Sequence, residues 1–212
     1  ALSVIAIAEK DNLFHAPETY MEKISSKVNE KGVVDLDYTV KENIFNLCEY
    51  LNKKPESITA CILDRPRHKK IIAEINKLGA KIKLISDGDI SGALLVTDEK
   101  YDVDIFLGIG GSPEGVLAAS ALNSFNCIFQ GRFLFDTEVD KLRASKMGIK
   151  NLTKKYELNE IVKGDSIFCA TGITSGDLVS GIKVENDKLT TETLVTHKSS
   201  GLKKIIKKVI NK

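Results

Sequence analysis

The sequence contains no tryptophan, and aromatic residues make up only 6% of its 212 residues. Proteins that bind single-stranded nucleic acid stack the bases on aromatic side chains, so this scarcity argues against such a surface. A strong charge of either sign is also lacking, because 31 basic and 29 acidic residues leave a formal net charge of +2. That balance provides no whole-molecule field to attract a polyanion, and neither nucleic acid nor a membrane is expected as a partner.

Long apolar runs and cysteine motifs are missing as well. No run approaches the ~20 apolar residues of a membrane span, and no basic segment precedes the apolar N-terminal stretch as it would in a signal peptide. The four cysteines lie far apart, so neither a zinc ribbon nor a redox motif is indicated. Cys61 and Cys169 lie in apolar runs, which favours buried thiols in a reducing, cytoplasmic location.

The residues that are present describe a globular α/β protein. Hydrophobic residues make up 42% of the chain, enough for a substantial core. A capping box, Thr39-x-x-Glu42, predicts a helix that runs to about Leu51. From residue 58 onward, apolar strands alternate with helices, which predicts βαβ units and a largely parallel sheet flanked by helices. The expected strands are 58–64, 81–85, 103–109 and 126–130, and the expected helices follow the first three of them.

The two ends of the chain suggest further elements. Residues 1–8 read as an apolar strand at the very start, which suggests a piece of a longer protein. Residues 140–147 predict a charged helix, 165–170 a strand, and 178–197 a hairpin that turns at 185–187. Residues 203–212 carry five lysines among apolar pairs. A membrane-surface or nucleic-acid patch is one interpretation, but the shortness of the segment favours a solvated final element.

Three loops are candidates for a binding site. In open parallel sheets, ligands bind outside the carboxyl ends of the strands. This rule selects residues 64–68, 87–89 and 108–115, each of which lies between an expected strand and an expected helix. The three loops should therefore converge on one rim.

The first loop carries Arg65 and Arg67 on either side of Pro66, which fits the first turn of a helix. Two guanidinium groups at a helix N-terminus are suited to clamp a phosphate. The alternative is that both are solvated surface charges, and the pattern by itself does not separate the two. The neighbouring His68 is interpreted as a capping side chain in preference to a general base.

The second loop holds two carboxylates, Asp87 and Asp89, with Gly88 between them. Such a pair can bind a hard cation or accept hydrogen bonds from sugar hydroxyls. A tight turn in which Asp89 caps the next helix is the structural alternative.

The third loop, 108–115, resembles a G-x-G-x-x-G dinucleotide loop, but Pro113 stands at the third glycine position. The next strand closes on Gln130 and not on an acid, which also argues against a dinucleotide site. A P-loop is absent. The glycines let the backbone approach an anion, and Ser112 is expected to cap the following helix. Glu114 is either a partner of the helix dipole or a ligand of Mg²⁺ or Mn²⁺.

Taken together, the motifs of this chain resemble those of class II fructose-1,6-bisphosphatase, within the metal-dependent, lithium-sensitive sugar phosphatases. No single motif is specific, but their order and spacing are, and the resemblance covers essentially the whole chain. The matching segments are 15–23 (HAPETYMEK), 62–68 (ILDRPRH), 87–89 (DGD), 108–116 (GIGGSPEGV), 130–132 (QGR) and 170–177 (ATGITSGD).

This resemblance implies a layered α/β architecture and a step of gluconeogenesis, the hydrolysis of the 1-phosphate of fructose 1,6-bisphosphate. Sedoheptulose 1,7-bisphosphate is a second substrate in some members, and the cofactor is Mn²⁺ or Mg²⁺. By motif position, the resemblance implies that one group of residues holds the substrate, chiefly its non-reacting phosphate: Tyr20, Arg65, Pro66 and Arg67. A second group would contact the sugar or a phosphate: Asp87, Gly88, Asp89 and Gly111. Glu114 would be a metal ligand.

The chain departs from the family pattern in one respect. The Asp-Pro-Ile-Asp-Gly-Thr-type motif and its acidic metal ligands are missing, and Asp35-Leu36-Asp37 does not replace them. Residues 1–212 are therefore expected to form the C-terminal two-thirds of such an enzyme, with weak activity when isolated. A non-catalytic phosphosugar-binding module is the alternative, and the coding sequence upstream of Ala1 would separate the two. The sequence is compatible with a homo-oligomer and does not fix the oligomeric state.

Overall fold

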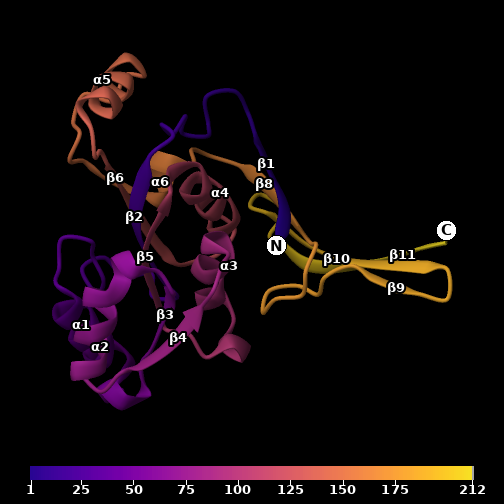
Figure 1. Ribbon diagram of the computed structural model, residues 1–212, viewed down its shortest axis with the longest axis horizontal. Coiled ribbons are helices and arrows are strands. Elements are labelled where there is room, and N and C mark those ends of the chain that lie inside the picture. Colours follow the sequence, from indigo (N-terminus) through magenta and orange to yellow (C-terminus); the bar gives the residue numbers. More distant parts are fainter. Residues whose placement is uncertain (212) are drawn as a thin grey trace.

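A computed structural model describes residues 1–211 and places a six-stranded mixed sheet at the centre of the molecule (Figure 1). Its strands follow the order β4-β3-β5-β2-β6-β7. β3 pairs in parallel with β4 and β5, whereas β2 is antiparallel to both of its neighbours and β7 is antiparallel to β6. The bounds are β2 (Tyr20–Ser26), β3 (Thr59–Leu63), β4 (Lys81–Ile85), β5 (Ile105–Gly111), β6 (Ile128–Leu134) and β7 (Lys155–Glu157).

A second sheet is antiparallel throughout its described strands, in the order β1-β8-β10-β11, with β9 paired to β10. In Figure 1 the β9, β10 and β11 end of this sheet extends away from the body of the molecule. The bounds are β1 (Leu2–Ala8), β8 (Ser166–Gly172), β9 (Lys183–Glu185), β10 (Lys188–His197) and β11 (Leu202–Asn211).

Helices cover both faces of the six-stranded sheet. α1 and α2 pack on one face, and α3 and α4 pack on the other, where α4 also contacts β1 and β8 of the second sheet (Figure 1). The bounds are α1 (Val40–Leu51), α2 (Lys69–Lys77), α3 (Asp89–Leu94), α4 (Ser112–Leu122), α5 (Glu138–Lys146) and α6 (Leu158–Ile161). Short 3₁₀ helices span Pro55–Ser57, Pro66–His68, Leu95–Thr97 and Glu99–Tyr101.

Two hydrophobic cores share the central sheet, one on each face. Because side chains alternate along a strand, Ile105 and Leu107 of β5 enter the core beneath α1 and α2, and Phe106 enters the opposite core. Phe168 of the second sheet also belongs to the core that contains Phe106. The layers are therefore joined by strands that contribute to both cores.

Several predicted elements are confirmed, including the α/β class. Thr39 and Glu42 form the capping box that begins α1. Gly79, with a φ of +77°, follows Leu78, the C-cap of α2, in a conformation that favours glycine. Asn186 and Asp187 have positive φ values and form the turn between β9 and β10. Residues 203–211 lie in the exposed strand β11.

The prediction of a largely parallel sheet is wrong. Among the described strands of this sheet, only β3, β4 and β5 are linked by parallel pairing, because β2 inserts between β5 and β6 and is antiparallel to both, and β7 is antiparallel to β6. The sequence did not predict β2 as a strand, because it lacks the alternation of apolar and polar residues that marks a half-buried strand. In the structure the last four residues of β2 are all buried. None of the helices in the described part of the chain combines the length and apolar character of a membrane span.

Candidate functional site

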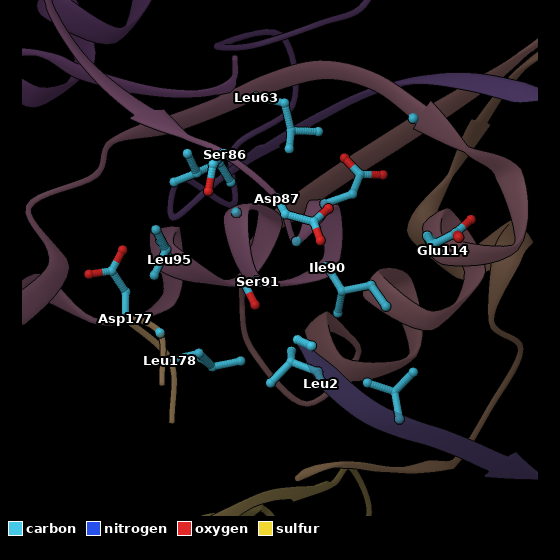
Figure 2. A pocket seen from close by; sticks show the side chains of 18 of the residues that line it. Leu2, Leu63, Ser86, Asp87, Ile90, Ser91, Leu95, Glu114, Asp177 and Leu178 are labelled. Atoms are coloured by element: carbon cyan, nitrogen blue, oxygen red, sulfur yellow. The ribbon is translucent and has the colours of Figure 1, made fainter. Parts of the chain in front are cut away.

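The three loops selected from the sequence line one cavity of about 1010 Å³, on the rim where β3, β4 and β5 end. Figure 2 shows the side chains of Asp87 and Glu114 on this cavity, together with those of Ile90 and Ser91 from α3. Convergence follows from the parallel pairing of β3 with β4 and β5, which brings their carboxyl ends to the same edge. The loop residues that line the cavity include Arg65, Arg67, Asp87, Gly88, Asp89, Gly110, Gly111 and Glu114.

The opposite wall of the cavity comes from the segment after β8 and from the start of β1. Asp177 and Leu178 lie on this side in Figure 2. Lys83 of β4 forms an ion pair with Asp177 at 3.2 Å, which links this wall to the strand that leads into the Asp87 loop. Residues 170–177 carry part of the family resemblance, but they are not among the site residues predicted from the sequence.

Arg67 and Tyr20 form the best-defined part of the arginine loop. The Arg67 guanidinium carbon lies 5.0 Å from the centre of the Tyr20 ring, and Arg67 Nε donates to Ile109 O at 2.8 Å. Stacking on a ring and one backbone bond orient the fork while its terminal nitrogens remain available to an anion. Arg67 is exposed, so this arrangement suits a ligand that arrives from solvent.

Arg65 is held more loosely. Its Nη2 lies 3.7 Å from Asp87 Oδ1, and its Nη1 donates to Asp64 O at 3.0 Å. Pro66 begins the 3₁₀ helix between the two arginines, where its missing N–H leaves no hydrogen bond unmade. The two guanidinium groups therefore flank a rigid turn on the cavity rim.

His68 has a structural role, but not the capping role that the sequence suggested, because its side chain makes no cap hydrogen bond at the start of α2. The ring is fully buried, with Nδ1 2.7 Å from Leu63 O and Nε2 accepting from the backbone N–H of Ile109 at 2.8 Å. Because Nε2 accepts, Nδ1 carries the proton and donates to Leu63. The imidazole thus joins the ends of β3 and β5 and does not reach the cavity as a base.

The two aspartates of the second loop have different environments. The side chain of Asp87 is 83% exposed, whereas that of Asp89 is 10% exposed. Asp89 does not cap α3: it is the first helical residue, and Gly88, with a φ of +93°, takes the cap position without a side-chain bond. Asp89 Oδ2 instead accepts from Lys23 Nζ.

The glycine loop brings backbone and carboxylates into close contact. A Cβ atom at Gly110 would overlap the Asp89 carboxylate, and one at Gly111 would overlap that of Glu114. Ser112 does not cap α4, since its hydroxyl donates to Thr19 O at 2.8 Å and the cap position is Gly111. The strand after α4, β6, is separated from β5 by β2, whereas the two strands of the βαβ unit in a dinucleotide site are neighbours.

Lys23 is a site residue that the sequence did not single out. It lies on β2 with its side chain fully buried, and its Nζ also donates to Gly111 O at 2.8 Å. Burial lowers the pKa of the Lys23 ammonium, and the nearby Asp89 and Glu114 carboxylates oppose that shift. The sequence around it, Met21-Glu22-Lys23-Ile24, carries no signal of burial, because charged residues are mostly exposed.

The rim offers carboxylate oxygens from Asp89 and Glu114 to a divalent cation. Glu114 presents an exposed carboxylate to the cavity, and Asp89 Oδ1 is a buried oxygen without a hydrogen-bond partner among residues 1–211. Within the same residues, no group of three or more histidine, cysteine, aspartate or glutamate side chains is arranged to hold a metal. Mg²⁺ and Mn²⁺ sites require more oxygen ligands than one carboxylate supplies, so these residues do not form a complete metal centre.

The cysteines take no part in the site chemistry. Burial raises the pKa of the Cys61 thiol to about 12, which keeps it protonated and unreactive at neutral pH. Burial likewise raises the pKa of Cys127 to about 12. Cys61 is fully buried, as its apolar surroundings predicted, whereas Cys169 is partly exposed.

The fold and the rim define an α/β protein with a glycine-lined cavity that carries both arginines and carboxylates. A family profile described as bacterial fructose-1,6-bisphosphatase, glpX-encoded, matches residues 1–210. The chain therefore belongs to the class II fructose-1,6-bisphosphatase family.

Three curated relatives agree with this assignment. Each is named D-fructose 1,6-bisphosphatase class 2/sedoheptulose 1,7-bisphosphatase. The Synechocystis sp. protein is 36% identical over 97% of this chain and 64% of its own length. A Synechococcus sp. relative is 37% identical over 94% and 61%, and the Microcystis aeruginosa relative is 36% identical over 92% and 60%. The chain thus spans about three-fifths of the length of these relatives.

Proposed function

We propose that this chain provides the substrate-binding rim of a sugar-bisphosphate phosphatase that acts on fructose 1,6-bisphosphate, with sedoheptulose 1,7-bisphosphate as a second substrate. The observation that carries the proposal is the convergence of three phosphosugar-type loops on one cavity, in a member of this family. The layered architecture of the sugar-phosphatase superfamily is part of the proposal. So is a reducing, cytoplasmic location, in keeping with four free thiols.

The proposed division of roles follows the chemistry of each loop. Arg65 and Arg67 clamp the non-reacting phosphate beside Tyr20, because guanidinium forks match phosphate geometry. Pro66 keeps the two forks apart on a rigid turn, and Gly111 lets the backbone approach the substrate closely.

The second loop is assigned to the sugar. Asp87 and Asp89 accept hydrogen bonds from sugar hydroxyls, with Gly88 allowing the turn between them. The unpartnered Oδ1 of Asp89 supports this role, because a buried carboxylate oxygen needs a donor.

Glu114 is proposed to contribute one ligand to a divalent cation, Mn²⁺ or Mg²⁺, that would polarise the leaving phosphoryl group. The remaining ligands are not among the described residues of this chain. The chain alone is therefore expected to bind sugar bisphosphate and to release phosphate slowly, if at all.

Calorimetric titration of the chain with fructose 1,6-bisphosphate tests the binding role. Arg67→Ala should weaken the affinity about ten- to a hundredfold, because losing a charged hydrogen bond costs roughly 1.5–3 kcal/mol. Arg143→Ala, which removes an exposed arginine on α5, is the matched control and should leave the affinity unchanged. Equal affinities for wild type and Arg67→Ala would mean that the arginine is only a surface charge.

Phosphate release with added Mn²⁺ separates the enzyme from a non-catalytic binding module, the second candidate. That module is favoured by the lack of a three-ligand group among residues 1–211. Rapid, manganese-dependent release by the 212-residue chain would exclude the module and contradict the expectation of weak activity.

A further inference from the structure

Lys23 is among the largest fully buried side chains in the described part of the molecule, and it lies directly behind the candidate site. It occupies the middle of β2, where its backbone is opposite Gly108 on β5 and Gly131 on β6. An ammonium group removed from water is strongly destabilising unless charged or polar partners surround it. Its position on a central strand therefore calls for an explanation in terms of its partners.

The partners of Lys23 come from two different loops of the rim. Nζ donates to Asp89 Oδ2 in the loop after β4 and to Gly111 O, 2.8 Å away, at the end of β5. An ammonium has three protons and no acceptor, so it can bridge several oxygens at once. One buried cation thus connects the aspartate loop with the glycine loop.

The glycines around Lys23 make this bridge sterically feasible. A Cβ atom at Gly115 would lie 3.2 Å from Lys23 Cε and 2.5 Å from Met21 Sδ, and one at Gly110 would overlap the Asp89 carboxylate. Glycine at these positions leaves the channel through which the lysine reaches both loops. The space is therefore shaped for the bridge and not for packing alone.

We propose that Lys23 is a positioning residue that fixes the Asp89 carboxylate and the Gly111 backbone in the geometry that binds the sugar bisphosphate. By occupying Oδ2, the ammonium holds Asp89 in one rotamer and leaves Oδ1 as the free acceptor on that carboxylate. Without the ammonium, the carboxylate can rotate and the two loops lose their only shared side-chain cation among the described residues. The inference rests on the proposed binding function, because it explains how two parts of that site stay in register.

Two substitutions at this position separate charge from packing. Lys23→Met keeps a long, unbranched side chain but removes the charge, whereas Lys23→Arg keeps the charge in a larger side chain. In the full chain, Lys23→Met should weaken the affinity for fructose 1,6-bisphosphate about ten- to a hundredfold, as expected for the loss of charged hydrogen bonds. Lys23→Arg should recover most of that affinity even where it is less stable to urea than the wild type.

A second, partly buried ion pair provides the control for stability. Lys53 Nζ lies 2.7 Å from Asp104 Oδ1, and Asp104 precedes β5, at the end of the strand away from the site. Lys53→Met breaks this pair and should lower stability to urea while changing the affinity less than about twofold, since distant sites act independently. If Lys23→Met binds as the wild type does, or if Lys53→Met weakens binding equally, the positioning role is refuted.

Amide hydrogen exchange distinguishes a failure of this inference from a failure of the proposed function. Lys23→Met should speed exchange at residues 88–91 and 110–112 together, and Lys53→Met should not. A wild-type chain that fails to bind fructose 1,6-bisphosphate would refute the proposed function, and the exchange result would still decide whether Lys23 joins the two loops. Unchanged exchange at both loops in Lys23→Met overturns the inference. This measurement does not depend on Lys23→Arg, so it tests the inference even if that variant does not fold.

Discussion

At the residue scale, burial and hydrogen bonding separate side chains that the sequence places side by side. Asp87 and Asp89 stand two positions apart, yet Asp87 faces solvent while Asp89 is paired with a buried ammonium. His68 follows directly on the exposed Arg67 but is fully buried between two backbone groups. Each role is set by the atoms around the residue and not by its neighbours in the chain.

A prediction for His68 follows from its two backbone partners. His68→Ala would leave the Ile109 N–H and the Leu63 carbonyl unpaired in a buried region, and an unpaired buried group costs roughly 1–3 kcal/mol. The free energy of unfolding in urea should therefore fall by about 2 kcal/mol or more. His15→Ala, at an exposed histidine, should change it by less than about 0.5 kcal/mol. Similar losses in the two variants would rule out a structural role specific to His68.

At the scale of elements, the turn between β10 and β11 is held by a cluster of polar side chains. Asp165 Oδ2 lies 2.9 Å from His197 Nε2, and Asp165 Oδ1 accepts from the backbone N–H of Ser199 at 2.9 Å. Ser200 Oγ lies 2.8 Å from His197 Nδ1 on the other side of the ring. The cluster connects this turn to Asp165, which directly precedes β8.

The carboxyl group of Asp165 reports on this turn. Its hydrogen bonds with Ser199, and then those with His197, lower its pKa from 3.8 to about 2. Because the pKa of Asp165 is lower in the folded state, its carboxylate contributes fully to stability above pH 3.8. This contribution is lost as the pH falls through about 2. A carbon-13 titration of the Asp165 carboxyl should therefore show a midpoint near 2.

Variants of the two serines check the cause of that shift. Ser199→Ala should move the Asp165 midpoint upward toward 3.8, because the Ser199 side chain is the largest contributor to the shift. Ser200→Ala should move it less, since Ser200 contacts the imidazole and not the carboxylate. A midpoint near 3.8 in the wild type, or equal shifts in both variants, would contradict this account of the turn.

At the scale of the whole molecule, two cores depend on one sheet. Ile105 and Leu107 pack beneath α1 and α2, and Phe106 between them packs against the other core. A disturbance in either core therefore displaces the backbone of β5. Since the three site loops leave β3, β4 and β5, their geometry depends on both cores.

Unfolding should consequently be a single transition that either core can shift. Leu47→Ala, in the core beneath α1, should reduce the free energy of unfolding by about 2–5 kcal/mol. Amide exchange should then accelerate in α4 as well as in α1, because the sheet between them is shared. Val139→Ala, at a side chain that is 62% exposed, is the control. Loss of protection confined to α1 would mean that the two cores unfold separately.

How far the sequence predicted the structure depends on the range of the interactions involved. Thr39 and Glu42 begin α1 through contacts three residues apart, so the capping box could be read locally. The rim formed by Arg65, Asp87 and Gly111 was also predictable, because successive parallel strands bring their carboxyl ends together. The role of Glu114 at that rim remains a prediction.

The strand β2 could not be predicted in this way. Tyr20 is opposite Gly111 on β5 and Leu134 on β6, pairings that span about 90 and 115 residues and leave no local periodicity. The insertion of β2 turned an expected parallel sheet into a mixed one. It also brought Lys23 behind the site and Tyr20 beneath Arg67.

The sequence by itself determined the family, the α/β class and the three loops of the rim. Short-range hydrogen bonding, hydrophobic alternation and the fixed direction of parallel strands act over a few residues or a single connection. Only the tertiary structure decided the wall around Asp177, the separate environments of Asp87 and Asp89, and the partners of Lys23. Those features depend on which distant strands pair and on what each side chain meets when water is excluded.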